Sequence, residues 1–394
     1  MPQLLTTIQE ALKEYYLPVW NNQLGIEPTA FLSRIKKVPV TSDKIVASAP
    51  IGLSGGFGFG AEGQNTPASG NQRFARFMTD TKDMYVNVEI SQKAMSLTGS
   101  SGSMADALKT EIDAAYATAK WNVGRSLFGN GTGILATIKT ANSSANKVVI
   151  VDDVTTIKEG LTVDVYNASK TKTGGGYRVD AVSRTKNSSG YYEVTLDTAI
   201  TTADNGFITV QNSYNREIDG LGVIFDDTIT SIYGLSKSAN PYLKPIAHDA
   251  NNLISDSVLT RALRESDRDK GAKVDMIMMG DDAYDSYLDY LRTNNIRVEE
   301  RTGDLEGGFK SVKFLHSGRT VDIVNEEFVP AKEAWGIDTS VMELHQTDWS
   351  FADRNTGGIF TLLENQSVYR ALLFNYGNLI CKNPGGCIRI YNCA

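Results

Sequence analysis

The sequence predicts an α+β protein of two or three domains, in which a small β-rich domain is inserted into a larger one. Three observations predict this class. A chain of 394 residues is too long for one compact core. Apolar spacings of three and four residues indicate one long helix within 103–128. After that helix, residues 137–213 change to short β-rich segments, and α/β patterning resumes only from Asn251.

Composition and charge exclude several classes of protein. Apolar residues make up 41% and charged residues 22% of the chain, which excludes fibrous, collagen-like and wholly disordered proteins. The net charge of −7 argues against a protein whose main task is binding nucleic acid, although it allows a local basic face. No apolar run approaches the roughly 20 residues of a membrane span, and the start lacks a signal-peptide pattern. We therefore expect a soluble protein made in the cytoplasm, with no membrane partner.

The first forty residues predict an arm. Residues 7–10 match a capping box, and Pro18 ends the short helix that begins there. Another turn or two is expected over 31–35. Because the arm has few apolar residues, it must lie along something larger, in its own subunit or in a neighbour.

A long hairpin with a glycine-rich tip is expected next. Residues 44–51 are extended in character, and 84–90 alternate apolar and polar side chains with the two-residue period of a strand. Between them lies a segment centred on the glycine-rich run 52–63. The simplest connection is a two-stranded hairpin with a flexible tip. Because an isolated hairpin is marginal in water, we expect an external partner to cover it.

A structural strut follows the hairpin. Ser103 and Asp106 form a plausible N-cap pair, apolar residues recur from Leu108 to Leu127, and the glycine-rich run 129–133 ends the helix. At 1.5 Å per residue such a helix is roughly 35–40 Å long.

The inserted segment predicts a small barrel or sandwich. Short β-rich runs at near-regular spacing, separated by Gly, Asn, Ser and Thr clusters, are typical of both architectures. The expected strands are 147–151, 161–166, 177–183, 191–196 and 206–210.

The segment from Asn251 predicts an α/β domain. An amphipathic helix ends at Gly271, and Asp281 opens a second helix. The expected strands are the buried 274–279, the hairpin 312–315 with 320–324, and the terminal runs 341–346 and 366–374.

One glycine motif matches the sequence pattern of a dinucleotide-binding site but lacks the structural context that such a site needs. Residues 58–63 read G-x-G-x-x-G, but a dinucleotide site needs that turn to join a strand to a helix whose N-terminus meets the pyrophosphate. Residues 64–70 do not begin a helix, and Asp80 and Asp83 lack a βαβ unit around them. A flexible tip explains the run better than a nucleotide site.

No catalytic, cofactor-binding or metal-ligating residue is assigned, and we expect neither an enzyme nor a cofactor. There is no nucleophile elbow. The histidines are expected to be surface or packing residues: His248 in a polar loop, His316 at a hairpin turn and His345 in a strand. The odd number of cysteines argues against a disulfide framework, and their spacing argues against zinc. Buried or idle thiols are expected at Cys381, Cys387 and Cys393.

Paired and clustered charges are expected to be structural. Adjacent carboxylates on a strand face opposite ways, so they rarely share an acid/base site. For Asp281 and Asp282 a helix cap is the simpler explanation. The mixed-sign clusters 264–270 and 299–301 are either solvated faces or charge matching between identical subunits, and we favour the second. The other carboxylate pairs are Asp152 with Asp153 and Asp226 with Asp227.

The order of these parts resembles the major capsid proteins of tailed bacteriophages, which have the Hong Kong 97-type fold. The order is arm, glycine-tipped hairpin, strut helix, β-rich insert, α/β domain and terminal strands. The matching segments are packing and turn patterns, each weak alone but collinear over nearly the whole chain. They are Tyr15 with Tyr16, 31–35, 105–128 with 129–133, 219–222, 233–241, and 318–324 with 329–330.

The resemblance implies a division of the chain. Residues 1–44 would be the N-terminal arm, 45–82 the extended loop that lies over an adjacent subunit, and 83–136 the peripheral domain with the spine helix. The insert 137–213 is optional in the family; it would stabilise contacts, present a surface to a decoration protein, or simply tolerate variation. The remaining parts would be 214–240 returning to the peripheral domain, 241–340 as the axial domain, and 341–394 as terminal strands of both.

The resemblance also implies a function. The chain would assemble with itself into pentamers and hexamers of an icosahedral head that encloses double-stranded DNA, with weak nonspecific DNA contact. The head has a portal protein; separate scaffolding and decoration proteins are optional partners. The protein would be assembled in the host bacterial cytoplasm and located in the virion. The rivals are an encapsulin-like compartment shell and an enzyme that uses the glycine-rich run for a nucleotide.

Two departures from the family pattern refine this expectation. Some family members link subunits covalently through a lysine on the extended loop, but none lies between Lys44 and Lys82, which predicts a noncovalent shell. Other relatives lose an N-terminal scaffolding segment by proteolysis. Met1 stands directly before the arm, so we expect any scaffolding to be a separate protein.

Overall fold

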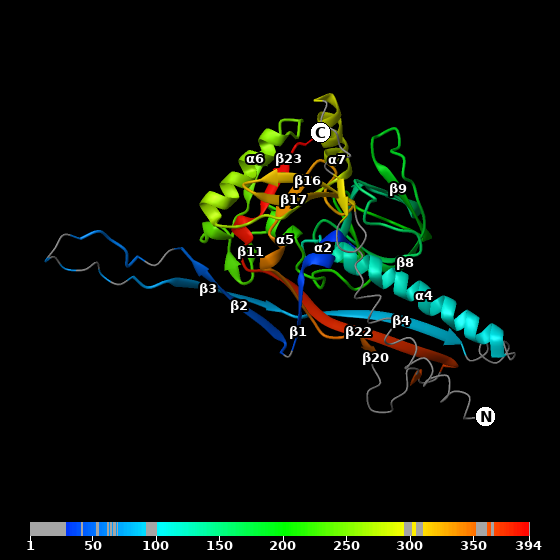
Figure 1. Cartoon of the computed structure of the whole chain (residues 1–394). Helices are drawn as coiled ribbons and strands as arrows, with labels where there is room; N and C mark the ends of the chain where they lie inside the picture. The colour runs from blue at the N-terminus through cyan, green and yellow to red at the C-terminus, as the bar shows by residue number, and fades with distance from the viewer. Residues whose placement is uncertain are drawn as a thin grey trace. The chain divides into compact units, whose positions relative to one another are not determined.

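The computed structural model divides the chain into two compact units, Met1–Ala119 with Ile224–Ala394, and Lys120–Val223. The second unit therefore interrupts the first in sequence. Figure 1 shows the elements in chain order. The described residues are 29–40, 42–52, 55–60, 63, 65, 68, 70–91, 101–294, 302–304, 310–351, 361–363 and 366–393.

The largest sheet of the first unit has seven strands among the described residues, in the order β13-β23-β18-β14-β17-β16-β15. Its central strand β14 consists of four buried residues, Met-Ile-Met-Met, so both faces of the sheet are covered there. The bounds are β13 Ile246–Asp249, β14 Met276–Met279, β15 Thr302–Asp304, β16 Lys310–His316, β17 Arg319–Asn325, β18 Ala334–Ile337 and β23 Ile388–Tyr391.

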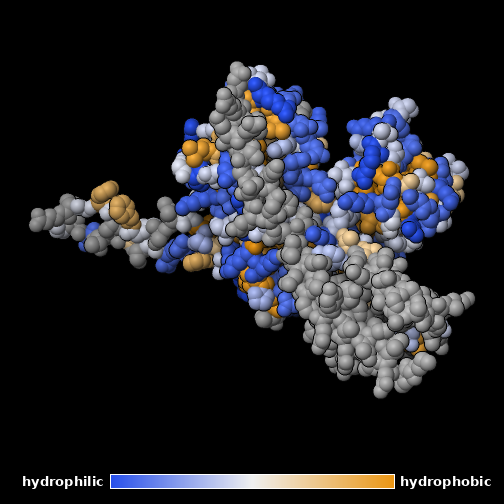
Figure 2. Space-filling view, turned by 45° about the vertical axis from the view of Figure 1, so that its right-hand side comes forward, coloured by the Kyte–Doolittle hydropathy of each residue, from blue (hydrophilic) through white to orange (hydrophobic). Residues whose placement is uncertain are grey.

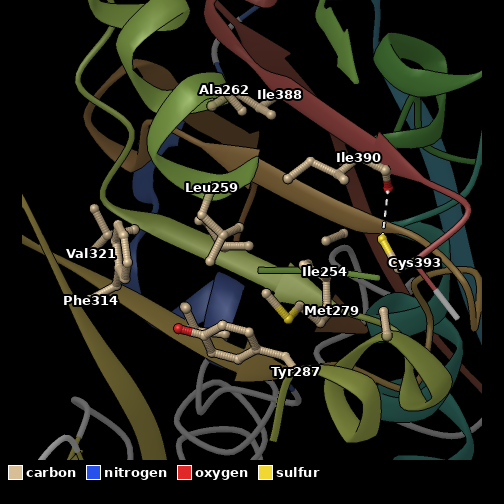
Figure 3. Close-up of a cluster of buried hydrophobic side chains, with 14 of the residues drawn as sticks. Ile254, Leu259, Ala262, Met279, Tyr287, Phe314, Val321, Ile388, Ile390 and Cys393 are labelled. Carbon is tan, nitrogen blue, oxygen red and sulfur yellow. Dashed lines mark hydrogen bonds between the residues drawn. The ribbon is translucent and has the colours of Figure 1, made fainter. Parts of the chain in front are cut away.

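Two amphipathic helices cover one face of this sheet. α6 spans Asp256–Glu265 and continues as one π-helical turn, Ser266–Lys270, while α7 spans Asp281–Thr293. The buried side chains of both helices pack on those of β14, β16, β17 and β23 (Figure 3). Gly271 ends the first helix with a left-handed φ of 62°, as the sequence predicts. The two helices and the 312–324 hairpin are confirmed.

A second sheet is built around the long strand β22, Val368–Cys381. β19 pairs with its C-terminal part, and β4 pairs antiparallel with residues 368–377. β22 confirms the strand expected over 366–374 and extends it. The other strands of this sheet are β1 Lys36–Pro39, β4 Lys82–Ser91, β19 Met342–Gln346, β20 Ser350–Phe351 and β21 Thr361–Leu362.

One pairing expected from the sequence is wrong. Residues 84–90 do form a strand, but this strand does not pair with residues 44–51. β2, Lys44–Ile51, pairs instead with β3, Arg73–Asp80, and the two form a separate two-stranded hairpin. The physical reason is that β4 finds a longer apolar partner in β22, which lies almost 300 residues later in the chain.

The second unit contains a closed barrel in the order β10-β5-β6-β9-β8-β7. Its interior is filled by fully buried side chains such as Ile138, Val149, Val163, Leu196 and Ile208. A small barrel is therefore confirmed, but β5, which closes it between β10 and β6, was not among the expected strands. The bounds are β5 Ile134–Thr140, β6 Asn146–Val151, β7 Thr162–Tyr166, β8 Lys172–Val182, β9 Tyr192–Ile200 and β10 Phe207–Val210.

The remaining elements are short except for one helix. α4, Ser101–Ser126, confirms the long helix that the apolar spacing predicts. α2, Ala30–Arg34, confirms the short turn expected in the arm, and Thr29 caps it by accepting the Leu32 N–H at 3.3 Å. The others are α5 Gly222–Phe225, β11 Ser231–Ile232, β12 Leu235–Ser236 and three 3₁₀ turns at Pro241–Leu243, Thr339–Val341 and Pro384–Gly386.

The buried Glu326 is expected to make stability depend on pH. Burial, together with the neighbouring Glu327 carboxylate, raises the pKa of Glu326 from 4.5 to about 8. Between these two values the folded protein holds a proton that the unfolded chain has released, so the free energy of unfolding falls as pH rises. E326Q is therefore expected to stabilise the protein by about 2–4 kcal/mol at pH 8.5 and by less than about 1 kcal/mol at pH 5.

Urea unfolding at the two pH values measures this effect. E327Q is a second variant: because the Glu327 carboxylate helps to raise the pKa of Glu326, its removal is expected to reduce the pH dependence only in part. An E326Q protein with the same pH dependence as the wild type would show that Glu326 is ionised in the folded state.

Candidate assembly interface

The β2–β3 hairpin has two different faces. Its register runs from Lys44 opposite Asp80 to Ile51 opposite Arg73. Because side chains alternate along a strand, Ala47 and Phe77 lie on a face that is buried, and their neighbours lie on the other.

The second face carries an apolar ladder that is open to solvent. Val46 lies opposite Met78, and Pro50 lies opposite Phe74. Val46, Met78 and Phe74 are 49%, 45% and 64% exposed. Directly opposed side chains of an antiparallel pair are in contact range, so this face carries two apolar pairs, with the exposed pair of Ser48 and Arg76 between them. A surface of this kind is typical of a contact with another molecule.

The end of the hairpin is aromatic as well as glycine-rich. Phe57 and Phe59 are 80% and 96% exposed, and their rings meet edge to face with centroids 5.3 Å apart. The two chain segments approach closely below them: a Cβ added to Gly70 would lie 2.3 Å from the Gly55 nitrogen. Figure 2 shows hydrophobic atoms close to the end of the hairpin. Glycine is needed here for close approach, and the apolar rings are left available for a partner.

The base of the hairpin is anchored through Tyr233. Its ring packs on Phe77 with centroids 5.6 Å apart, and its backbone oxygen accepts the Met78 N–H at 3.3 Å. Its hydroxyl oxygen accepts the Cys381 N–H of β22 at 2.8 Å. Asn378 of β22 adds a second link, since its amide donates to Thr79 Oγ1 and to the Asp80 oxygen at 2.8 and 2.9 Å. The hairpin is thus held at its base, while its end carries exposed rings.

Tyr233 itself occupies a strained position. Its φ of +51° is left-handed, and Gly234 follows with +78°, which makes a tight turn between β11 and β12. A bulky residue adopts this conformation only where surrounding contacts hold it. The contacts to Phe77 and Cys381 are of that kind.

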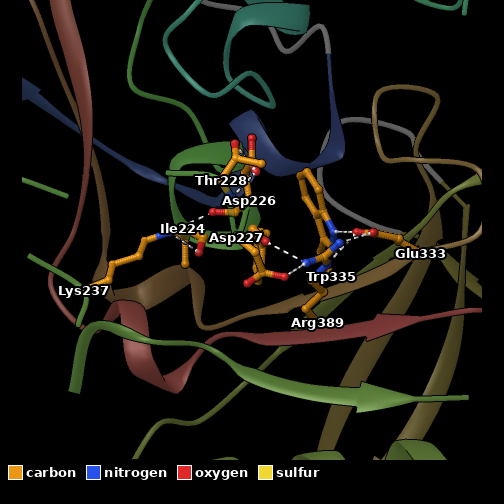
Figure 4. Close-up of polar contacts among 9 residues, drawn as sticks. Ile224, Asp226, Asp227, Thr228, Lys237, Glu333, Trp335 and Arg389 are labelled. Atoms are coloured by element: carbon orange, nitrogen blue, oxygen red, sulfur yellow. Dashed lines mark hydrogen bonds and ion pairs between the residues drawn. The ribbon is translucent and has the colours of Figure 1, made fainter. Parts of the chain in front are cut away.

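A polar network fixes the chain segment that leads to this turn (Figure 4). The Arg389 guanidinium donates to Asp227 Oδ2 at 2.7 Å and to Glu333 Oε1 at 2.5 Å, and hydrogen bonding to Glu333 raises its pKa. The Lys237 ammonium donates to the backbone oxygens of Ile224 and Asp226, both at 3.1 Å. Burial lowers the pKa of Lys237.

The described part of the arm lies on its own subunit. Arg34 donates to Asp322 Oδ2 of β17 at 2.5 Å, and Lys36 of β1 lies 3.5 Å from Glu343 of β19. The capping-box helix expected from residue 7 lies outside the described residues.

The glycine motif does not have the geometry of a nucleotide site. Residues 58–63 lie between β2 and β3, and the next regular element is a strand that pairs back along β2. The strand–turn–helix unit that such a motif requires is therefore missing from the described part of this segment.

The three histidines each lie beside a carboxylate. His316 is buried with Nε2 3.2 Å from Asp267, and Nε2 of His345 lies 3.3 Å from Glu343. His248 lies in strand β13 with Nε2 2.9 Å from Glu265, so its expected place in a polar loop is wrong. That strand forms because β23, the last strand of the chain, pairs with it in parallel.

The charged pairs have structural surroundings. Asp281 and Asp282 lie in the first turn of α7, and Gly280 is the N-cap, so the expected side-chain cap is wrong. Asp281 accepts instead from the Asn325 amide at 2.9 Å. Asp226 accepts from Thr228 in a local turn. The cluster 299–301 lies outside the described residues.

The cysteines are buried and unpaired, as expected. Burial raises the pKa of Cys393 to about 12, and a hydrogen bond with the Cys381 thiol, together with burial, raises that of Cys387. In the described part of the chain no cluster of three metal-binding side chains occurs. Among the same residues, no helix has the length and apolar character needed to cross a membrane.

Sequence reasoning missed the residues that matter most at the hairpin. It gave no role to Phe57 and Phe59 beyond the glycine run, and none to Tyr233 or Asn378. A two-residue period identifies a strand but not which face is left open, whereas the Tyr-Gly pair at 233–234 was a usable turn signal.

Comparisons with known proteins identify the fold. No protein-family model and no curated protein sequence matches the chain. Among solved structures it is similar to a chain of the cyanophage A-1(L) capsid asymmetric unit, with a TM-score of 0.55, 12% identity and 92% of each chain covered. Two weaker similarities follow. The holo-SrpI encapsulin complex from Synechococcus elongatus PCC 7942 gives a TM-score of 0.47 at 10% identity, covering 93% of this chain and 88% of that chain. Mycobacterium phage Bobi gives 0.45 at 9% identity, covering 93% and 90%. The first similarity shows that the chain has the fold of a phage capsid protein.

Proposed function

We propose that this protein is a major capsid subunit that assembles into the pentamers and hexamers of an icosahedral phage head around double-stranded DNA. The observation that carries the proposal is the β2–β3 hairpin, which is anchored at its base and exposes an apolar ladder and two aromatic rings. The capsid-type fold supports the same function.

The assembly mechanism is geometric. Covering Phe57 and Phe59 on a neighbouring copy removes two large apolar side chains from water, each of which contributes about 1.5–3 kcal/mol. The ladder of Val46, Phe74 and Met78 adds apolar area to the same contact. Because every subunit both gives and receives a hairpin, the contacts are head-to-tail and close into rings.

The chain would be divided as in Hong Kong 97-type capsid proteins. The hairpin lies within 45–82, the proposed extended loop. The seven-stranded sheet with α6 and α7 lies mostly within 241–340, the proposed axial domain, and β4 with β22 would belong to the peripheral domain. The barrel is the proposed insert, whose interior is filled by its own side chains.

DNA contact would be weak and nonspecific. The net charge of −7 limits attraction to phosphate, so a few inward lysine or arginine side chains would make salt-sensitive contacts. The other proposed partners are a portal protein and, optionally, separate scaffolding and decoration proteins. The subunit would assemble in the host cytoplasm and remain in the virion.

The first test is the mass of the purified protein by light scattering after size exclusion, followed by negative-stain microscopy. We expect pentamers, hexamers or hollow shells. A protein that stays monomeric even with scaffolding and portal proteins supplied would contradict the proposal. Shells that protect protein cargo rather than double-stranded DNA from digestion would instead favour the encapsulin-like alternative.

A further inference from the structure

The β2–β3 hairpin leaves the second sheet at a single residue. β3 ends at Asp80 and β4 begins at Lys82, so only Thr81 separates a strand of the hairpin from a strand of the sheet. The Thr81 N–H donates to the Asp43 backbone oxygen at 3.0 Å, which ties the two chains of the hairpin together at this point. A two-stranded ribbon has no core of its own, so its direction relative to the sheet depends on the contacts near Thr81.

One edge of β22 is open beside this point. Gly377 pairs with Lys82 of β4 on one side and with Gln346 of β19 on the other. Beyond Gly377, β19 continues the pairing as far as Cys381, but β3 does not replace β4, because among the described residues it pairs with β2 alone. Residues 378–381 of β22 therefore have a strand neighbour on one side only in the described part of the chain.

The Tyr233 hydroxyl fills part of this open edge. The Lys382 N–H donates to the Val341 oxygen at 3.0 Å, next to β19. Because successive N–H groups along a strand point to opposite edges, the Cys381 N–H points away from β19. The Tyr233 hydroxyl oxygen accepts that N–H at 2.8 Å, in the place where a neighbouring strand would supply a carbonyl oxygen.

Tyr233 and Asn378 also hold the hairpin. The Tyr233 ring packs on Phe77 with centroids 5.6 Å apart, and its backbone oxygen accepts the Met78 N–H at 3.3 Å. The Asn378 amide of β22 donates to Thr79 Oγ1 at 2.8 Å. Each of these two side chains therefore joins the hairpin to β22.

The turn that carries Tyr233 is itself fixed. The Lys237 N–H donates to the Thr230 oxygen at 2.9 Å, and the Lys237 ammonium donates to the backbone oxygens of Ile224 and Asp226. Tyr233 has a left-handed φ of +51°, which a residue with a large side chain adopts only where its surroundings hold it. Strained positions of this kind cluster where the local geometry is used in function.

We infer that Tyr233, together with Asn378, is a positioning residue for assembly, which fixes the angle between the β2–β3 hairpin and β22. A hairpin held at one angle presents Phe57 and Phe59 to the next copy in one direction, so the angle sets the curvature between neighbouring subunits. Fixing the angle before contact also lowers the entropy that is lost on binding. This inference rests on the proposed assembly function and assigns the residues that orient the hairpin contact.

Y233F tests the inference with a small change. It keeps the ring on Phe77 but removes the hydroxyl oxygen that accepts the Cys381 N–H. Loss of one hydrogen bond changes an opening equilibrium by about three- to tenfold, so the Cys381 amide is expected to exchange its hydrogen faster by that factor. Mass spectrometry of peptides that contain Cys381 measures the exchange. Y391F is the matched control, because the Tyr391 hydroxyl makes no hydrogen bond among the described residues.

A distance between two spin labels reports the angle itself. The labels are attached through S48C on β2 and N87C on β4, two exposed positions that lie roughly 15–20 Å from Thr81 along their strands. The native cysteines are buried, so the labels attach to the two introduced thiols. Pulsed electron paramagnetic resonance of the unassembled subunit is expected to give a narrow distance distribution in the wild-type background and with Y391F. A broader distribution is expected with Y233F and with N378A, which removes the link to Thr79.

Shell geometry is the functional readout. The wild type is expected to form shells of uniform diameter, and Y233F is expected to form shells of mixed diameter or shells that do not close. Negative-stain microscopy measures the diameters. Circular dichroism reports folding, and N378A carries the same test if Y233F unfolds.

The outcomes separate this inference from the proposed function. Unchanged exchange at Cys381 and an unchanged distance distribution in Y233F would overturn the role of Tyr233 and leave the capsid function intact. A broader distribution with shells as uniform as those of the wild type would show that the angle does not control assembly, and would overturn the inference as well. A wild type that forms no shells would overturn the proposed function and the role of the angle in assembly, whereas exchange and label distances would still report whether Tyr233 fixes the hairpin.

Discussion

Deletion of residues 54–70 is expected to abolish shell assembly and leave a folded, monomeric subunit. These residues include Phe57 and Phe59, whose rings are almost fully exposed in the subunit, so their loss removes no core contact. The hairpin below them remains paired from Lys44 to Ile51 and stays anchored through Tyr233. Light scattering and negative-stain microscopy measure the assembly, and circular dichroism measures the fold.

A milder variant separates the effect of the hairpin's length from the effect of its two aromatic side chains. F57S/F59S keeps the whole hairpin but removes both rings, and it is expected to weaken assembly strongly without changing the melting temperature. Normal shells from the deletion would rule out the hairpin as an assembly contact. If F57S/F59S alone forms normal shells, the assembly contact of the hairpin is made by Val46, Phe74 and Met78 and not by the two rings.

R125M is expected to lower the free energy of unfolding of the second unit by about 3–5 kcal/mol. The Arg125 guanidinium donates to both carboxylate oxygens of Glu217, at 3.0 and 2.5 Å, and the two side chains are only 6% and 9% exposed. Removing the arginine leaves a buried carboxylate without its cation, which is more costly than losing the pair as a whole. Urea unfolding followed by circular dichroism measures the loss.

The double variant R125M/E217L is the control for this prediction. It replaces the pair by apolar side chains and is expected to recover much of the lost stability, because no charge is left buried. A loss below about 1 kcal/mol in R125M would show that water reaches Glu217 in the folded protein.

Local patterns predicted most of the regular elements. α4, α6 and α7 follow from apolar spacings of three and four residues, and Gly271 marks the end of one helix. The barrel strands β6 to β10 follow from β-rich runs between turn residues, and the repeated short runs already indicated a barrel or a sandwich. These signals depend on residues within a few positions of one another, so they can be recognised in a single sequence.

The candidate interface was predicted only in outline. The glycine-rich run 52–63 indicated a hairpin that needs a partner, and the structure places that run at the end of β2 and β3. Two features depend on distant residues: which strand pairs with β2, and which face of that hairpin is exposed. β3 pairs with β2 because β4 pairs with β22 instead. Phe77 is covered because the Tyr233 ring packs on it.

The sequence alone determined the fold class, the order of the elements and the expectation of self-assembly. Only the tertiary structure decided the strand pairings and the chemistry of the surfaces. β5 closes the barrel by pairing with β10, and His248 lies in a strand because β23 pairs with β13. The reason is physical: helix spacing and turns are local, whereas ladder partners and burial are set by contacts between residues separated by tens to hundreds of positions. A single sequence does not specify such contacts until the chain has folded.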